Sequence, residues 1–89
     1  MQVEKVSSTV FTLLADGTAV LLNLDTLLYY SLNRSGAAVW NQIEEKKIVS
    51  LDDLVASTCD QFDVDQTGAR RALTSFVEEL VRLKMVHLA

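Results

Sequence analysis

Proline is absent from the 89-residue sequence, and cysteine and histidine occur once each, which argues against several classes of protein. With Cys59 as the single thiol, no internal disulfide can form. A metal centre needs several converging ligands and a catalytic nucleophile needs an anchored base, whereas His87 lies next to the end of the chain. We therefore expect no metal, no cofactor and no catalytic residues, and the sequence does not predict an enzyme.

Charge and hydropathy argue against two further kinds of partner. The formal net charge of −4 opposes binding to duplex nucleic acid or to an anionic membrane. No basic segment followed by an apolar run stands at the amino terminus, and no apolar run approaches the roughly 20 residues of a membrane span. The composition, 49% hydrophobic and 22% charged, is typical of a folded domain. We expect one cytoplasmic domain over residues 1–89, with neither nucleic acid nor membrane as a partner.

Strand-like patterns fill the first third of the chain. Strands are predicted at residues 9–15, 19–24 and 27–32, which are rich in β-branched and aromatic residues or alternate in character. Asp16 and Gly17 form a dipeptide that tight hairpin turns favour, because both residues tolerate positive φ angles. Short connections of this kind predict an antiparallel meander.

The third predicted strand has two different sides. Leu28, Tyr30 and Leu32 alternate with Tyr29 and Ser31, and we expect Tyr30 and Leu32 to pack first against the core. No other predicted segment covers the outer edge of this strand. Its backbone groups should therefore remain unpaired.

Helical periodicity replaces the strand pattern after Asn33. Asn33, Ser50 and Asp65 are each suited to cap a helix, because their side-chain oxygens can accept hydrogen bonds from free amides of the first turn. The predicted fold class is therefore α+β: a three-stranded antiparallel sheet over about residues 9–33, followed by three helices over about residues 34–88.

The third predicted helix, which runs to about residue 84, carries two stripes when projected at about 100° per residue. The apolar face consists of Ala69, Ala72, Leu73, Phe76, Leu80 and Leu83. The second stripe, about a quarter turn away, consists of Arg70, Thr74, Val77, Val81 and Lys84. Either the two valines of the second stripe pack against the first helix, or they line a groove bordered by two cations.

Five segments follow one another in a distinctive order: residues 19–26 (AVLLNLDT), 29–33 (YYSLN), 35–40 (SGAAVW) and 62–65 (FDVD), and Phe76 with Leu80. In this order and spacing they resemble the PqqD-like family, named for pyrroloquinoline quinone biosynthesis protein D. The resemblance extends over nearly the whole chain.

The resemblance implies a small winged-helix-like, non-catalytic domain that captures the leader of a ribosomally made precursor peptide. The leader would pair with the exposed third strand by β-augmentation, in a groove walled by the third helix, and be presented to a modifying enzyme such as a peptidase, a radical enzyme or a cyclase. Under this hypothesis the third strand gives the backbone edge, the second stripe gives an apolar wall, and its cations meet acidic side chains of the leader. The expected peptide-binding residues are Leu28, Tyr29, Tyr30, Ser31, Leu32, Arg70, Thr74, Val77, Val81 and Lys84.

The chain departs from the family pattern at two positions. Leu27 stands near a turn that commonly carries glycine, and Lys84 stands where the last helix often ends in glycine. Because a left-handed conformation is strained for leucine and lysine, the geometry of both connections is in question.

Two other functions fit the predicted fold. A winged-helix regulator would bind DNA, although the cations of the third helix are spread around it and interrupted by Glu78 and Glu79. A homodimerisation module would pair the open edge strand with a second copy of the chain.

Overall fold

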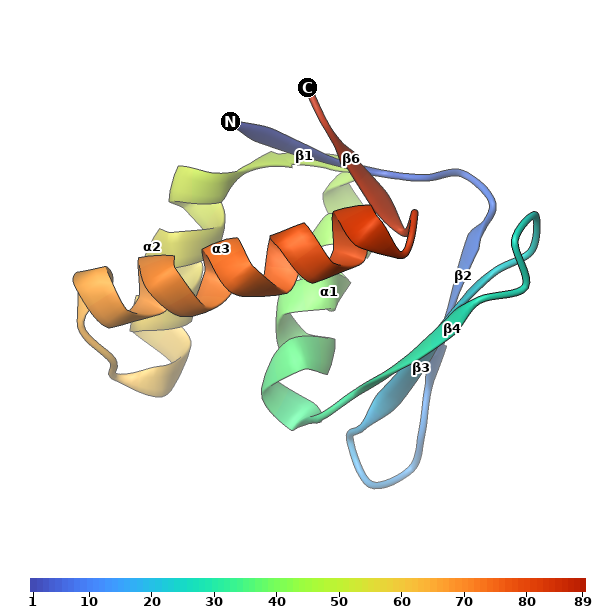
Figure 1. Ribbon diagram of the computed structural model, residues 1–89. Coiled ribbons are helices and arrows are strands. Elements are labelled where there is room, and N and C mark those ends of the chain that lie inside the picture. Colours follow the sequence, from blue (N-terminus) through green and yellow to red (C-terminus); the bar gives the residue numbers. More distant parts are fainter.

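The computed structural model describes residues 1–89 and contains six strands and three helices (Figure 1). The helices are α1 (Arg34–Lys46), α2 (Leu51–Phe62) and α3 (Gln66–Arg82). One antiparallel sheet has the strand order β5–β1–β6 and consists of β1 (Gln2–Lys5), β5 (Ile48–Ser50) and β6 (Val86–Leu88). The other has the order β2–β3–β4 and consists of β2 (Thr9–Leu13), β3 (Ala19–Asn23) and β4 (Tyr29–Leu32). None of the helices combines the length and the apolar character needed to cross a membrane.

The α+β class is confirmed. The expectation of a single sheet is wrong, because the structure has two sheets and the sequence predicts only the one formed by β2, β3 and β4. Strands β1, β5 and β6 are three or four residues long, too short to show a clear alternation. They form by pairing the two ends of the chain with its middle: Val3 lies opposite both Val49 and Leu88. The two termini therefore lie side by side (Figure 1), and His87 belongs to a strand.

The three predicted helix caps are confirmed. Asn33, Ser50 and Asp65 each accept a hydrogen bond from the backbone amide three residues later, at 2.8, 3.0 and 2.9 Å respectively. The α3 helix ends at Arg82 rather than near residue 84, because the chain reverses at Lys84 to enter β6.

One apolar core joins both sheets to the helices. Trp40 and Ile43 of α1 are fully buried, as are Leu21 of β3 and Leu80 of α3. The expectation that Leu32 and Tyr30 pack against the core is confirmed, since Leu32 is buried and Tyr30 packs against the buried cluster. The core-facing side chains of β4 therefore fix the position of this strand. The sheet of which β4 is the last strand lies beside α1 (Figure 1).

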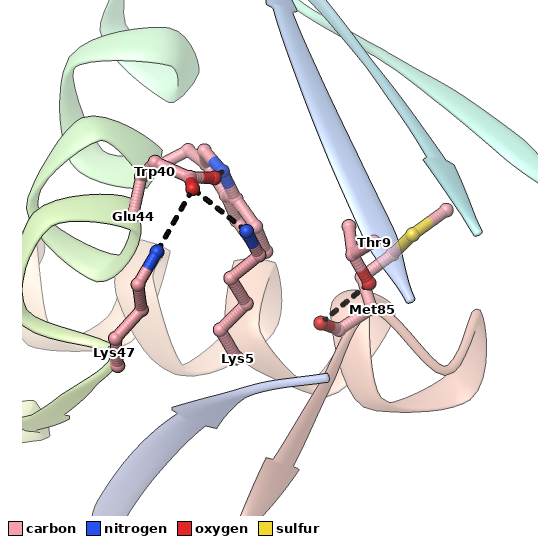
Figure 2. A network of polar contacts seen from close by, with 6 residues as sticks. All are labelled: Lys5, Thr9, Trp40, Glu44, Lys47 and Met85. Atoms are coloured by element: carbon pink, nitrogen blue, oxygen red, sulfur yellow. Dashed lines mark hydrogen bonds and ion pairs between the residues drawn. The ribbon is translucent and has the colours of Figure 1, made fainter. Parts of the chain in front are cut away.

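A network of polar contacts fastens β1 to α1 (Figure 2). The Glu44 carboxylate accepts hydrogen bonds from Lys5 at 2.7 Å, from Lys47 at 3.2 Å and from the Trp40 indole at 3.1 Å. Partial burial by itself raises the pKa of Glu44, but the hydrogen bonds from Lys5, Trp40 and Lys47 outweigh it and hold that pKa below its ordinary value. Nearby, the Thr9 hydroxyl donates to the Met85 carbonyl at 3.2 Å and joins β2 to the start of β6 (Figure 2).

The buried Asn23 side chain joins the turn before β4 to the turn after α3. Its Oδ1 accepts hydrogen bonds from the amides of Asp25 and Thr26, at 2.8 and 3.2 Å, and its Nδ2 donates to the Lys84 carbonyl at 2.7 Å. Leu27 and Lys84 take φ angles of 63° and 60°, the left-handed conformation that glycine adopts without strain. Both turns therefore keep a glycine-like geometry without a glycine.

Candidate functional site

Strand β4 has one neighbour only, so one of its edges is unpaired. The termini do not cover this edge, because they pair with each other in the other sheet. Asn23 donates its amide to the Leu28 carbonyl at 2.9 Å, and Leu21 lies opposite Tyr30. Because hydrogen-bonded and non-hydrogen-bonded pairs alternate along an antiparallel ladder, Tyr30 directs its backbone groups toward β3. Tyr29 and Ser31 therefore direct their N–H and C=O groups toward the unpaired edge.

A groove of about 590 Å³ lies beside β4. Its β4 and α1 sides are formed by Tyr30, Ser31, Leu32, Asn33, Ser35, Gly36 and Val39. Its opposite side, from α2, the α2–α3 connection and α3, is formed by Thr58, Phe62, Val64, Asp65, Gly68, Ala69, Ala72, Leu73 and Phe76. Nine of the sixteen lining residues are hydrophobic, so the groove suits apolar side chains.

Small residues on α3 keep the groove open. Gly68 and Ala72 occupy the groove side of the helix with Phe76 one turn further on. A Cβ atom on Gly68 would lie 2.5 Å from the capping oxygen of Asp65, so this position favours glycine. The α3 wall of the groove therefore consists of small residues bordered by the aromatic Phe76.

The groove holds little charge. Asp65 is its one acidic lining residue, and that carboxylate already accepts the Gly68 amide as the cap of α3. No lysine or arginine lines the groove. An uncharged segment of a ligand fits this surface better than an acidic one.

The predicted strand residues fall into two groups. Tyr30, Ser31 and Leu32 line the groove. Leu28 and Tyr29 do not line it: Leu28 precedes β4, and the Tyr29 side chain is exposed on the other face of the sheet. Tyr29 still contributes backbone groups to the unpaired edge.

The predicted residues of α3 and the turn after it do not line the groove, and the structure corrects their placement. Val77 is buried in the core at 1% exposure, and Val81 packs against that core. Arg70 extends toward α2 and pairs with Asp52 at 2.6 Å, an interaction that lowers the pKa of the Asp52 carboxyl. Thr74 and Lys84 also lie outside the groove, Lys84 in the turn after α3.

The buried stripe of α3 differs from the expected apolar face, and the groove lies on the side of it opposite the predicted second stripe. Ala69, Leu73, Val77 and Leu80 are buried, so the core stripe includes Val77, which the sequence analysis placed on the second stripe. Ala72 and Phe76 lie on the side of this stripe opposite Arg70 and Thr74. In the sequence, the feature that could have predicted which side of α3 faces the groove is the set of small residues at 68, 69 and 72, followed by the aromatic Phe76.

An unpaired strand edge beside an apolar groove is the arrangement by which many domains bind an extended peptide. Residues 18–86 match the family described as coenzyme PQQ synthesis protein D (PqqD), and the chain belongs to this family. The family resemblance predicted from the sequence is therefore confirmed. Its members are non-catalytic peptide-binding modules, in agreement with the expectation that the chain is not an enzyme.

Two solved structures share the fold. TbiB1, in complex with the TbiA(β) leader peptide, superposes with a TM-score of 0.86 at 24% identity, over 97% of this chain and 96% of that one. Lasso peptide synthetase B1, complexed with the leader peptide, superposes with a TM-score of 0.79 at 20% identity, over 97% of this chain and 98% of that one. No curated protein matches the chain. At these identities the comparison with solved structures establishes the fold.

Proposed function

We propose that this domain binds the leader of a ribosomally made precursor peptide and presents it to a modifying enzyme, such as a peptidase, a radical enzyme or a cyclase. In this proposal the leader adds a strand to the edge of β4 and places apolar side chains in the groove, with the β2–β3–β4 sheet acting as the wing of a winged-helix-like domain. The observation that carries the proposal is the position of the groove, which begins at the unpaired edge of β4 and is walled by α3. The leader peptides bound by TbiB1 and lasso peptide synthetase B1 support it.

The expected contributions to the binding free energy indicate that both the backbone edge of β4 and the groove are needed to bind a leader. Tyr29 and Ser31 offer two donors and two acceptors, worth about 0.5–1.5 kcal/mol per hydrogen bond. This gain is of the same size as the cost of ordering the ligand, about 2–5 kcal/mol. Burial of two medium apolar side chains in the groove adds about 3–6 kcal/mol. The groove therefore decides whether binding is measurable, because the backbone hydrogen bonds and the ordering cost nearly cancel.

The pleat of a strand limits how the ligand can lie. Successive side chains of an added strand point to opposite faces of the sheet, so alternate residues of the leader would face the groove. Tyr30 and Leu32 face the same side. A leader with two uncharged apolar residues at positions i and i+2 meets this requirement.

A charge placed in the groove tests the proposal. Ala72 is exposed and lines the groove, so Ala72→Glu should leave the fold intact while placing a carboxylate where apolar side chains bind. We expect the affinity for a fluorescently labelled synthetic leader to fall about tenfold or more in an anisotropy titration, because the carboxylate would lose solvent without gaining a partner.

The matched control is Ser75→Glu, which adds the same charge to an exposed position of α3 outside the groove. Its affinity should stay within about twofold of the original protein, because exposed charges interact weakly through water. If Ala72→Glu binds the leader as tightly as Ser75→Glu does, the groove is not the binding site.

DNA binding has less support from the structure. Arg70 and Arg82, two of the three arginines of α3, are paired with Asp52 and Glu79. The recognition helix of a DNA-binding winged helix presents cations that are free to reach phosphates and bases.

A further inference from the structure

The β2–β3–β4 sheet has a second side, which faces away from the core and which we call the outer face. In the strand register, Val10, Leu22 and Tyr29 lie opposite one another across the three strands, and so do Thr12, Val20 and Ser31. Alternation places both rows on the side opposite the buried Leu21. None of these six positions carries a charge.

The outer face exposes much apolar surface. Tyr29 of this face and Leu27, in the turn that leads into β4, are about 70% exposed, and Leu24, Leu14 and Val10 are between 42% and 55% exposed. Leu14 and Leu24 continue the same alternation, because they lie opposite Thr18 and Ser8, to which they are hydrogen-bonded. Scaled by the surfaces of the free residues, the exposed fractions of the outer face and of the adjoining Leu27 together give roughly 600 Å², which is as large as the largest apolar patch of an ordinary monomer.

Leu27 adds an independent observation. It is the most exposed large apolar residue of the chain, and it is held in the left-handed conformation at a φ of 63°. Such strain costs leucine about 1–2 kcal/mol. A side chain that is both strained and exposed gives the folded monomer no packing in return, and an apolar partner surface would supply that packing.

We infer that the outer face is the interface of a homodimer, in which two copies pack their β2–β3–β4 sheets face to face. Two patches of roughly 600 Å² would bury roughly 1,200 Å², the lower end of the range for specific interfaces. An uncharged face packs against its own copy without burying an unpaired charge, although each chain carries a net charge of −4. The packing would resemble a β-sandwich, with the sheets about 10 Å apart.

This dimer would leave the groove and the edge of β4 open, because Tyr29 and Ser31 would contribute side chains to the dimer and backbone groups to the edge. The outer face is formed by side chains that stand perpendicular to the sheet, whereas a peptide would pair in the plane of the sheet at the edge of β4. The inference therefore does not depend on the proposed function. It also differs from a dimer made through the edge of β4, because an edge-paired dimer would compete with the peptide.

Sedimentation velocity of the full chain tests the inference. Between about 5 and 500 µM, we expect the mass to rise from monomer toward dimer, as for a complex of micromolar affinity. Val10→Lys, on the outer face of β2 and two strands from the edge of β4, should remain monomeric throughout. Lysine is chosen because it lowers the net negative charge, so a loss of association cannot come from stronger overall repulsion.

Two comparisons make the result specific. Ile48→Lys, at a similarly exposed position on β5, should dimerise like the original chain. Leu27→Lys should lose association as Val10→Lys does, and an unchanged circular dichroism spectrum would show that both variants are folded.

The inference is overturned if the original chain stays monomeric at every concentration, or if Val10→Lys and Leu27→Lys both still dimerise. It is also overturned if a saturating synthetic leader dissociates the dimer, since that result indicates pairing through β4.

Discussion

Asn23 contributes more to this fold than its position in a strand suggests. A buried asparagine is costly unless its amide is satisfied, and here both ends of the amide are used. The oxygen fixes the turn into β4 and the nitrogen holds the turn that follows α3. One side chain therefore positions both the strand and the helix that border the groove.

Loss of this side chain should be costly. Asn23→Ala leaves the Lys84 carbonyl and the amides of the β3–β4 turn without their partner, and we expect the free energy of unfolding to fall by about 2–3 kcal/mol. Urea denaturation followed by circular dichroism measures this change. Asn41→Ala removes an exposed asparagine and should cost less than about 0.5 kcal/mol. Equal stabilities of the two variants would contradict the role of Asn23.

The backbone strain at Lys84 can be released by a substitution that removes no hydrogen bond of the lysine side chain. Lys84→Gly relieves the left-handed backbone but increases the entropy of the unfolded chain, whereas Lys84→Ala keeps the strain. We expect the glycine variant to be more stable than the alanine variant by about 1 kcal/mol in thermal or urea unfolding. A more stable alanine variant would mean that the positive φ is not strained.

Among the elements, the sequence predicts those whose signals are local. β2, β3 and β4 alternate, and the caps of all three helices are single residues with a known hydrogen-bonding role. The side of α3 that faces the groove depends on where α2 and β6 pack, and no local pattern gives that arrangement. Val77 therefore fits either stripe on a helical projection, and only the tertiary structure places it in the core.

The link between β1 and α1 makes stability depend on pH. Hydrogen bonds from Lys5, Trp40 and Lys47 hold the pKa of Glu44 below its ordinary value of 4.5. A lowered folded-state pKa means that the ionised carboxylate stabilises the fold above the unfolded-state pKa, and that this contribution is lost as the pH falls through the folded-state value.

Glu44→Gln should therefore cost about 1 kcal/mol at pH 7 and progressively less as the pH falls below about 4. Urea unfolding of both proteins at pH 7 and pH 3 measures the difference. Glu45→Gln, on the neighbouring exposed position of α1, is the control. A cost of Glu44→Gln that is the same at both pH values would show that the charge of Glu44 contributes nothing.

In the whole molecule, the ends of the chain build one sheet, and the outer edges of β2 and β4 in the other sheet remain unpaired. Val3 pairs with strands from the middle and the end of the sequence, contacts too distant for a sequence pattern to predict. Because both termini are used there, neither lies along β4. The groove, the edge and the outer face then lie around one strand, so a bound peptide and a second copy of the chain would approach β4 from different directions.

Amide hydrogen exchange of the domain, with and without a synthetic leader, tests the central claim most directly. The alternation of the ladder predicts that the Tyr29 and Ser31 amides, which face the unpaired edge, slow by about tenfold or more when the leader binds. The Tyr30 amide, directed toward β3, should change much less. A leader that binds without slowing exchange at Tyr29 and Ser31 would contradict pairing along β4.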